Sequence, residues 1–156
     1  MRNRADATDE AAYYDDVVLG REVEIGRHTP SREEIISFAS QWDPQPFHLD
    51  EEAGRNSVMG GLSASSCHTY SISSLIYSRS EAKLQTAAML GLQMKFPAPV
   101  RPDEELTLFE ICDEKRVSAS RPGFGIISSR TTMRNERGED VMVMESNFLV
   151  ARRDQT

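Results

Sequence analysis

The chain has few of the features that indicate a membrane protein, a secreted protein or a nucleic-acid-binding protein. None of its apolar runs reaches the length of a membrane span, and the mean hydropathy is −0.50. Its first ten residues, MRNRADATDE, lack the apolar core of a signal peptide. A net charge of −7 with scattered basic residues disfavours nucleic acid, whose phosphates require a basic face. We therefore expect a cytoplasmic protein that binds neither membranes nor nucleic acid.

Cysteine is also scarce, and histidine nearly so. Cys67 and Cys112 do not have the C-x-x-C spacing of a metal or redox pair, so we expect two buried small hydrophobic residues. His28, His48 and His68 could form a metal site by residue type, but no two of them have a ligand spacing on one element. We expect no metal.

What the chain does have is an acid and an imidazole five residues apart in a proline-rich stretch. Pro44 and Pro46 lack the amide N–H and restrict the residues before them, so we expect a stiff, non-helical loop from Asp43 to His48. Such a loop can hold two titratable side chains together, as activation of a water molecule requires. An isolated D-x4-H pair is usually a turn cap and a surface histidine. Here the preceding Trp42 and the following Gly-Gly sequence make the pair a candidate catalytic site.

The pattern of elements predicts an α+β fold with one domain, residues 13–156, after a flexible tail of residues 1–12. A strand is expected within residues 17–28 and a helix from Ser31 to Trp42. A second, central helix rich in small residues is expected from Leu62 to about Arg79. We expect the apolar face of the first helix to comprise Ile35, Ile36, Phe38, Ala39 and Trp42. Four further strands are expected at residues 86–96, 105–117, 124–134 and 141–152, with a hairpin loop at 135–139.

From residue 17 to residue 152 the order of motifs resembles the MaoC-like dehydratases and (R)-specific enoyl-CoA hydratases of the hot-dog superfamily. Those proteins carry a D-x-N-P-x-H segment, then a glycine-containing entry to a long central helix, then a strand with a K-x-P motif. The counterparts here are residues 43–48, 60–66 and 94–100. The resemblance implies a hot-dog domain, in which an antiparallel sheet of about five strands wraps around the central helix.

The resemblance also implies an activity, namely addition of water to a 2-enoyl-CoA or its removal from a 3-hydroxyacyl-CoA in fatty acid metabolism. Asp43 and His48 would activate the water and deliver a proton to the α-carbon. The backbone N–H of Ser66, where the family has glycine, would stabilise the thioester oxyanion. Ser74 would hydrogen-bond Asp43, and Gly61 would help to position the substrate. The reaction needs no cofactor besides the coenzyme A of the substrate.

Three departures from the family pattern leave other functions open. Ser66 adds a Cβ where the thioester must approach, Gln45 stands where asparagine is usual, and Pro44 is additional. The chain could therefore be a non-catalytic acyl-thioester binding module. A hot-dog thioesterase is the other alternative, although residues 62–80 contain no Asp or Glu to act from the central helix. His68 lies in residues 64–69, whose sequence ASSCHT is similar to an A-S-G-W-H-T variant found in part of the family. We expect His68 to be packed and hydrogen-bonded.

Partners follow from the same resemblance. Hot-dog proteins commonly pair a free sheet edge across a dimer, so we expect a homodimer or a higher homo-oligomer with the acyl-CoA at the interface. The basic residues Arg79, Lys83, Lys95 and Arg101 are candidates for a patch that attracts the anionic ligand.

Overall fold

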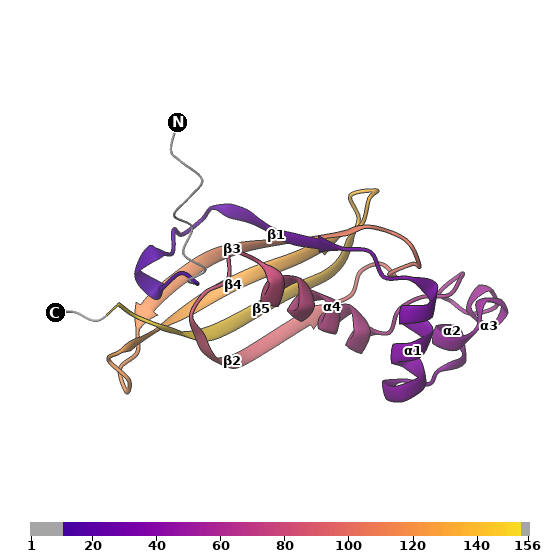
Figure 1. The fold of residues 1–156 in the computed structure, drawn as a ribbon, viewed down its shortest axis with the longest axis horizontal. Helices are drawn as coiled ribbons and strands as arrows, with labels where there is room; N and C mark the ends of the chain where they lie inside the picture. The colour runs from indigo at the N-terminus through magenta and orange to yellow at the C-terminus, as the bar shows by residue number, and fades with distance from the viewer. Residues whose placement is uncertain (1–10, 154–156) are drawn as a thin grey trace.

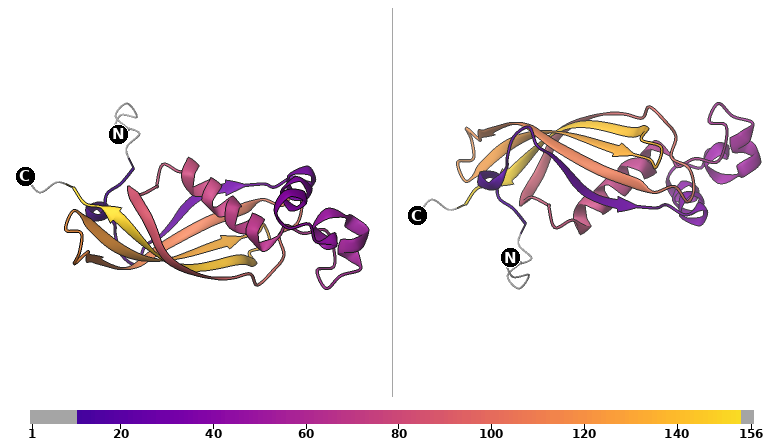
Figure 2. Two further views of the ribbon diagram at one scale, coloured as in Figure 1. Left: turned by 90° about the horizontal axis from the view of Figure 1, so that it is seen from below. Right: turned by 90° about the horizontal axis from the view of Figure 1, so that it is seen from above.

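The computed structural model describes residues 11–153, in which a curved sheet wraps around one long helix (Figures 1 and 2). The strand order is β1-β3-β4-β5-β2, and every neighbouring pair is antiparallel. The strands are β1 (Glu22–His28), β2 (Thr86–Lys95), β3 (Leu106–Val117), β4 (Phe124–Arg134) and β5 (Asp140–Ala151). The helices are the short η1 (Tyr14–Asp16), α1 (Arg32–Trp42), α2 (Pro46–Leu49), α3 (Glu51–Arg55) and α4 (Ser66–Arg79). The predicted α+β fold with five strands around a central helix is confirmed.

Helix α4 packs on the concave face of the sheet and forms the core with it. Ile72 and Ile76 are buried there together with Leu106, Leu108 and other inward-facing strand residues. Gly26 on β1 permits this close packing, because a Cβ at that position would lie 3.0 Å from the Ile76 side chain. No helix in residues 11–153 is long and apolar enough to cross a membrane.

Two helix boundaries differ from the predictions. Helix α4 begins at Ser66 rather than Leu62, because Ser65 caps it by accepting a 3.1 Å hydrogen bond from the His68 N–H. Residues 43–48 are not free of helix either, since Pro46 opens the four-residue helix α2 that contains His48. Proline is tolerated at a first helical position, where its missing N–H would have no intrahelical acceptor. The expectation of a wholly non-helical loop is therefore wrong.

Two side chains and one end of the expected N-terminal tail also differ from the predictions. Cys67 is exposed on α4, so only Cys112 is the buried thiol that was predicted. Trp42 is 70% exposed and does not belong to the buried face of α1. Residues 1–10 of the expected tail lie outside the described part of the chain, whereas Ala12 forms a parallel bridge with Leu84.

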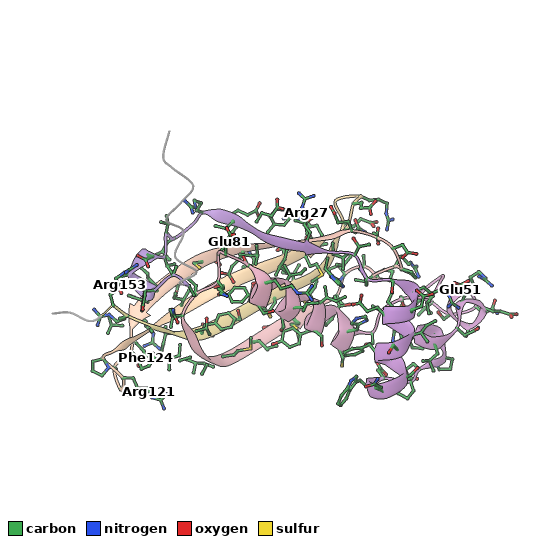
Figure 3. The ribbon with its side chains drawn as sticks, in the orientation of Figure 1. Arg27, Glu51, Glu81, Arg121, Phe124 and Arg153 are labelled. Atoms are coloured by element: carbon green, nitrogen blue, oxygen red, sulfur yellow. The ribbon has the colours of Figure 1, made fainter. Side chains whose placement is uncertain are left out.

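The helices α1, α2 and α3 project together beyond one end of the sheet (Figure 1). Figure 3 places Glu51 of α3 at the opposite end of the long axis from Arg121 and Phe124 in the β3–β4 region. The N-terminus of α4 points toward this helical end. The Asp43 segment and the start of the central helix are thereby brought to one end of the molecule.

Candidate active site

Asp43 and His48 lie close together at the junction of α1 and α2. Asp43 directly follows the last residue of α1 and continues its hydrogen bonding through its N–H to the Ala39 carbonyl, at 2.9 Å. Its carboxylate Oδ2 is 3.8 Å from Nε2 of His48, which is carried by α2. The His48 side chain is 6% exposed and that of Asp43 is 30% exposed. The pair thus combines a shielded imidazole with a carboxylate that solvent can reach.

The hydrogen bond made by Nδ1 determines which tautomer a neutral His48 adopts. Nδ1 of His48 lies 2.7 Å from the backbone carbonyl of Ser63. A carbonyl oxygen only accepts hydrogen bonds, so Nδ1 must donate the proton. In the neutral ring Nε2 then carries the lone pair, and this is the nitrogen that faces Asp43. The arrangement presents a base and a carboxylate toward the same space.

Ser63 belongs to the extended segment that leads into α4, which links the pair to the start of the helix. Ser66 is the first residue of α4, so its N–H has no acceptor within the helix. Only two residues separate Ser63 from Ser66, so the two lie at most about 11 Å apart along an extended chain. The Ser65 side chain accepts a hydrogen bond from the His68 N–H and not from the Ser66 N–H, and Ser66 is exposed. The helix start therefore offers a backbone donor near the Asp43–His48 pair.

The structure places the other two predicted site residues elsewhere. Ser74 lies two turns along α4 and borders a cavity between this helix and the sheet. Within residues 11–153 it makes no hydrogen bond to Asp43. Gly61 lies against the Arg101 guanidinium, since a Cβ at Gly61 would be 2.8 Å from Nη1. Arg101 in turn donates to the carbonyls of Met59 and Leu62, so Gly61 lets Arg101 hold the entry to α4.

Gly54 on α3 supports the same entry segment and was not identified from the sequence. A Cβ at Gly54 would lie 2.5 Å from both the carbonyl carbon of Gly61 and the backbone nitrogen of Leu62. These are backbone atoms, so they cannot yield as a flexible side chain would. The only sequence clue is a glycine inside a short helix that precedes the Gly-Gly pair.

We expect Gly54→Ala to destabilise the protein by about 1–3 kcal/mol, as overpacking of a tight contact does. Alanine gains up to about 1 kcal/mol of helix propensity, which this contact outweighs. The midpoint of urea unfolding measures the change. Gly123→Ala is the matched control, because a Cβ there meets nothing within 4 Å. Equal midpoints for the two variants would contradict the close contact between α3 and the entry segment.

A second cluster of titratable groups joins α1 to α4. Glu34 Oε1 lies 2.9 Å from Nε2 of His28 and 3.2 Å from Nε2 of His68. His68 stacks on Phe38 with ring centroids 4.5 Å apart, and burial lowers its pKa. The packed, hydrogen-bonded His68 was predicted from the sequence, but its partner Glu34 was not. His48 does not join this cluster, and no group of His, Cys, Asp and Glu in residues 11–153 is arranged to hold a metal ion.

The four basic residues do not form one patch. Arg79 and Lys83 precede β2 whereas Lys95 ends it, so the strand between them spans about 30 Å. Arg101 is engaged by the entry segment of α4. The four residues therefore do not together supply the basic patch for which they were candidates.

Comparison with known proteins gives consistent matches. The family model described as a MaoC like domain matches residues 16–132. A MaoC-like dehydratase of known structure from Rhodospirillum rubrum is 34% identical, with a TM-score of 0.86 over 93% of this chain and 100% of that one. The R-hydratase PhaJ1 from Pseudomonas aeruginosa is 19% identical, with a TM-score of 0.69 over 92% and 88% of the two chains. The uncharacterized protein YdeM of Bacillus subtilis is 28% identical over an alignment of 142 residues, and the match covers 88% of this chain and 98% of YdeM.

Proposed function

This chain belongs to the MaoC-like dehydratase family, and on that premise we propose that it adds water to 2-enoyl thioesters of coenzyme A, or removes water from the 3-hydroxyacyl thioesters. The observation that carries the proposal is the Asp43–His48 pair, with the basic nitrogen of His48 turned toward the carboxylate. We place the reaction in fatty acid metabolism in the cytoplasm, without a metal or a separate cofactor.

Water activation follows from the spacing of the pair. Oδ2 of Asp43 and Nε2 of His48 are 3.8 Å apart, which is too long for a direct hydrogen bond. A water oxygen about 2.8 Å from each atom fits this separation and can donate one hydrogen to each. As the oxygen of this water bonds to the β-carbon, the pair takes its proton and returns a proton to the α-carbon. The overall reaction consumes one water and leaves the pair unchanged.

The thioester oxygen becomes negative when water adds to the β-carbon. We propose that the Ser66 N–H donates to this oxygen, aided by the positive end of the α4 dipole. Gly61 acts indirectly by letting Arg101 hold the entry segment, and Ser74 borders the space that the acyl chain occupies. In this proposal Ser66 is the donor that contacts the substrate, and Gly61 and Ser74 are positioning residues.

The assay uses the purified protein, short 2-enoyl-CoA thioesters and no added metal. Loss of the conjugated absorbance without release of a free thiol is the expected result. Release of coenzyme A thiol in its place would indicate a thioesterase. Calorimetric binding of the thioester without hydration would indicate a non-catalytic binding module. Either of these two outcomes would overturn the hydratase proposal.

We further propose a homodimer, or a multiple of one, that pairs through the β2 edge. Among the described strands β2 is bonded only to β5, and its Leu90 is 52% exposed near the exposed Met89 and Leu92. Sedimentation at micromolar concentration should give at least a dimer, and Leu90→Lys should shift it toward monomer. Val58→Lys is the control, because Val58 is a fully exposed apolar residue in a loop away from β2. A stable wild-type monomer would contradict a substrate site at a subunit interface.

A further inference from the structure

A cavity of about 150 Å³ lies between the second half of α4 and the concave face of the sheet. This volume is well above the roughly 10–15 Å³ that a cavity needs in order to hold one water molecule. Tyr70 is the lining residue of α4 that lies nearest to Ser66 along the helix, one helical turn or about 6 Å away. Most of the lining is hydrophobic or aromatic: Tyr70, Tyr77, Met89, Leu108, Met144 and Phe148. A chain extending from a thioester held at Ser66 along α4 would enter this space.

One carboxylic acid lines this cavity. Glu110 follows the alternation of β3 and faces inward, two residues after the buried Leu108 and two before the buried Cys112. Its contacts among the described residues are weak: Thr131 Oγ1 lies 3.5 Å from Oε2, and the Cys112 thiol lies 3.9 Å from Oε1. Neither partner carries a positive charge. Glu110 therefore retains unused hydrogen-bonding capacity where a core residue would be apolar.

The neighbouring row of the sheet is also polar. Cys112 pairs in register with Ser129, and Ser129 with Ser146. The hydroxyl of Ser146 is buried and has no hydrogen-bond partner in residues 11–153. A buried hydroxyl without a partner costs folding free energy, but Ser129 and Ser146 do not line the cavity, so the hydrogen-bonding capacity left unused inside it is that of Glu110.

We propose that Glu110 makes the protein selective for acyl chains that carry a hydroxyl group beyond the reacting double bond. This inference rests on the proposed function, because it takes the cavity as the path of the acyl chain. A hydroxyl can donate to an ionised carboxylate and accept from a protonated one, so it suits Glu110 in either state. A hydrocarbon tail would leave Glu110 dehydrated and unpaired, which is the arrangement a site disfavours most strongly.

Calorimetry with octanoyl-CoA and its ω-hydroxy counterpart tests the selectivity without requiring turnover. Wild type is expected to bind the hydroxylated thioester about ten- to hundred-fold more tightly, the effect of a hydrogen bond to a charged group. Glu110→Leu should lose or invert this preference, and the isosteric Glu110→Gln should keep part of it. Glu114→Leu, on the same strand but exposed, should keep the full preference.

The possible failures are distinguishable. The role of Glu110 would be overturned if wild type bound both thioesters equally well. It would also be overturned if Glu110→Leu kept the wild-type preference for the hydroxylated thioester. Hydration of plain enoyl-CoA in that case would leave the proposed function standing. Failure of wild type to bind either thioester would overturn both.

A pH measurement checks the state of the carboxyl. Burial raises the pKa of Glu110 above 4.5, so the folded protein holds this proton more tightly than the unfolded chain. The resulting stability is present below pH 4.5 and is lost as the pH rises through the folded pKa. As the pH rises through this range, Glu110→Gln should therefore become more stable relative to wild type, and urea unfolding measures the difference. Parallel curves for the two proteins would contradict the burial on which the selectivity depends.

Discussion

Replacement of His48 by alanine is expected to lower kcat/KM for enoyl-CoA hydration by about 10²–10⁴-fold, the usual contribution of a positioned acid or base. The substitution removes the nitrogen that faces Asp43 and leaves the attacking water with a carboxylate alone. Asp43→Asn should cause a loss of similar size, because an amide cannot accept the proton of the water. The decay of the conjugated absorbance measures both variants.

In the proposed mechanism Asp43 and His48 act on one water molecule, so the effects of the two substitutions on kcat/KM should not add. The double variant is expected to be about as slow as the slower single variant, as for other catalytic groups that work as a unit. His28→Ala is the control, since His28 contacts Glu34 and not the Asp43–His48 pair. Turnover that survives in the double variant would remove both residues from the mechanism.

Substitution of Ser66 by proline is expected to lower kcat by about 10²–10³-fold, as loss of one oxyanion donor does. Proline deletes the backbone N–H but fits the first position of a helix. The preceding Ser65 already has φ −66° and ψ 158°, a conformation that a following proline favours. The helix should therefore persist, and circular dichroism together with urea unfolding checks that it does.

Ser66→Gly is the matched variant for this experiment. It retains the N–H, removes the Cβ and restores the residue that is typical of the family. Its kcat should equal or exceed that of wild type. If Ser66→Pro hydrates enoyl-CoA as fast as Ser66→Gly, the donor is not at the start of α4.

Much of the fold could be predicted because its determinants are local. The strand expected at residues 124–134 is confirmed with the same bounds, since its β-branched and aromatic residues favour extended backbone and Pro and Gly precede it. The end of α1 was predicted from Pro44, which disfavours helix in the residue before it. The start of α4 could not be predicted. Leu62 and Ala64 continue its apolar pattern, but the Ala64 N–H bonds to Val100, 36 residues away.

The sequence by itself determined the five strands and the presence of the two long helices, the family resemblance and the candidacy of Asp43, His48 and Ser66. These depend on residue type, periodicity and short spacing, which neighbours in the chain specify. Only the tertiary structure decided that the Ser63 carbonyl orients His48 and that Gly54 supports the entry segment. It alone placed Glu110 beneath α4, because that contact depends on how distant segments pack and not on the residues beside Glu110. The candidate catalytic pair was therefore visible in the chain, whereas the environment that we propose determines its substrate became visible only in the fold.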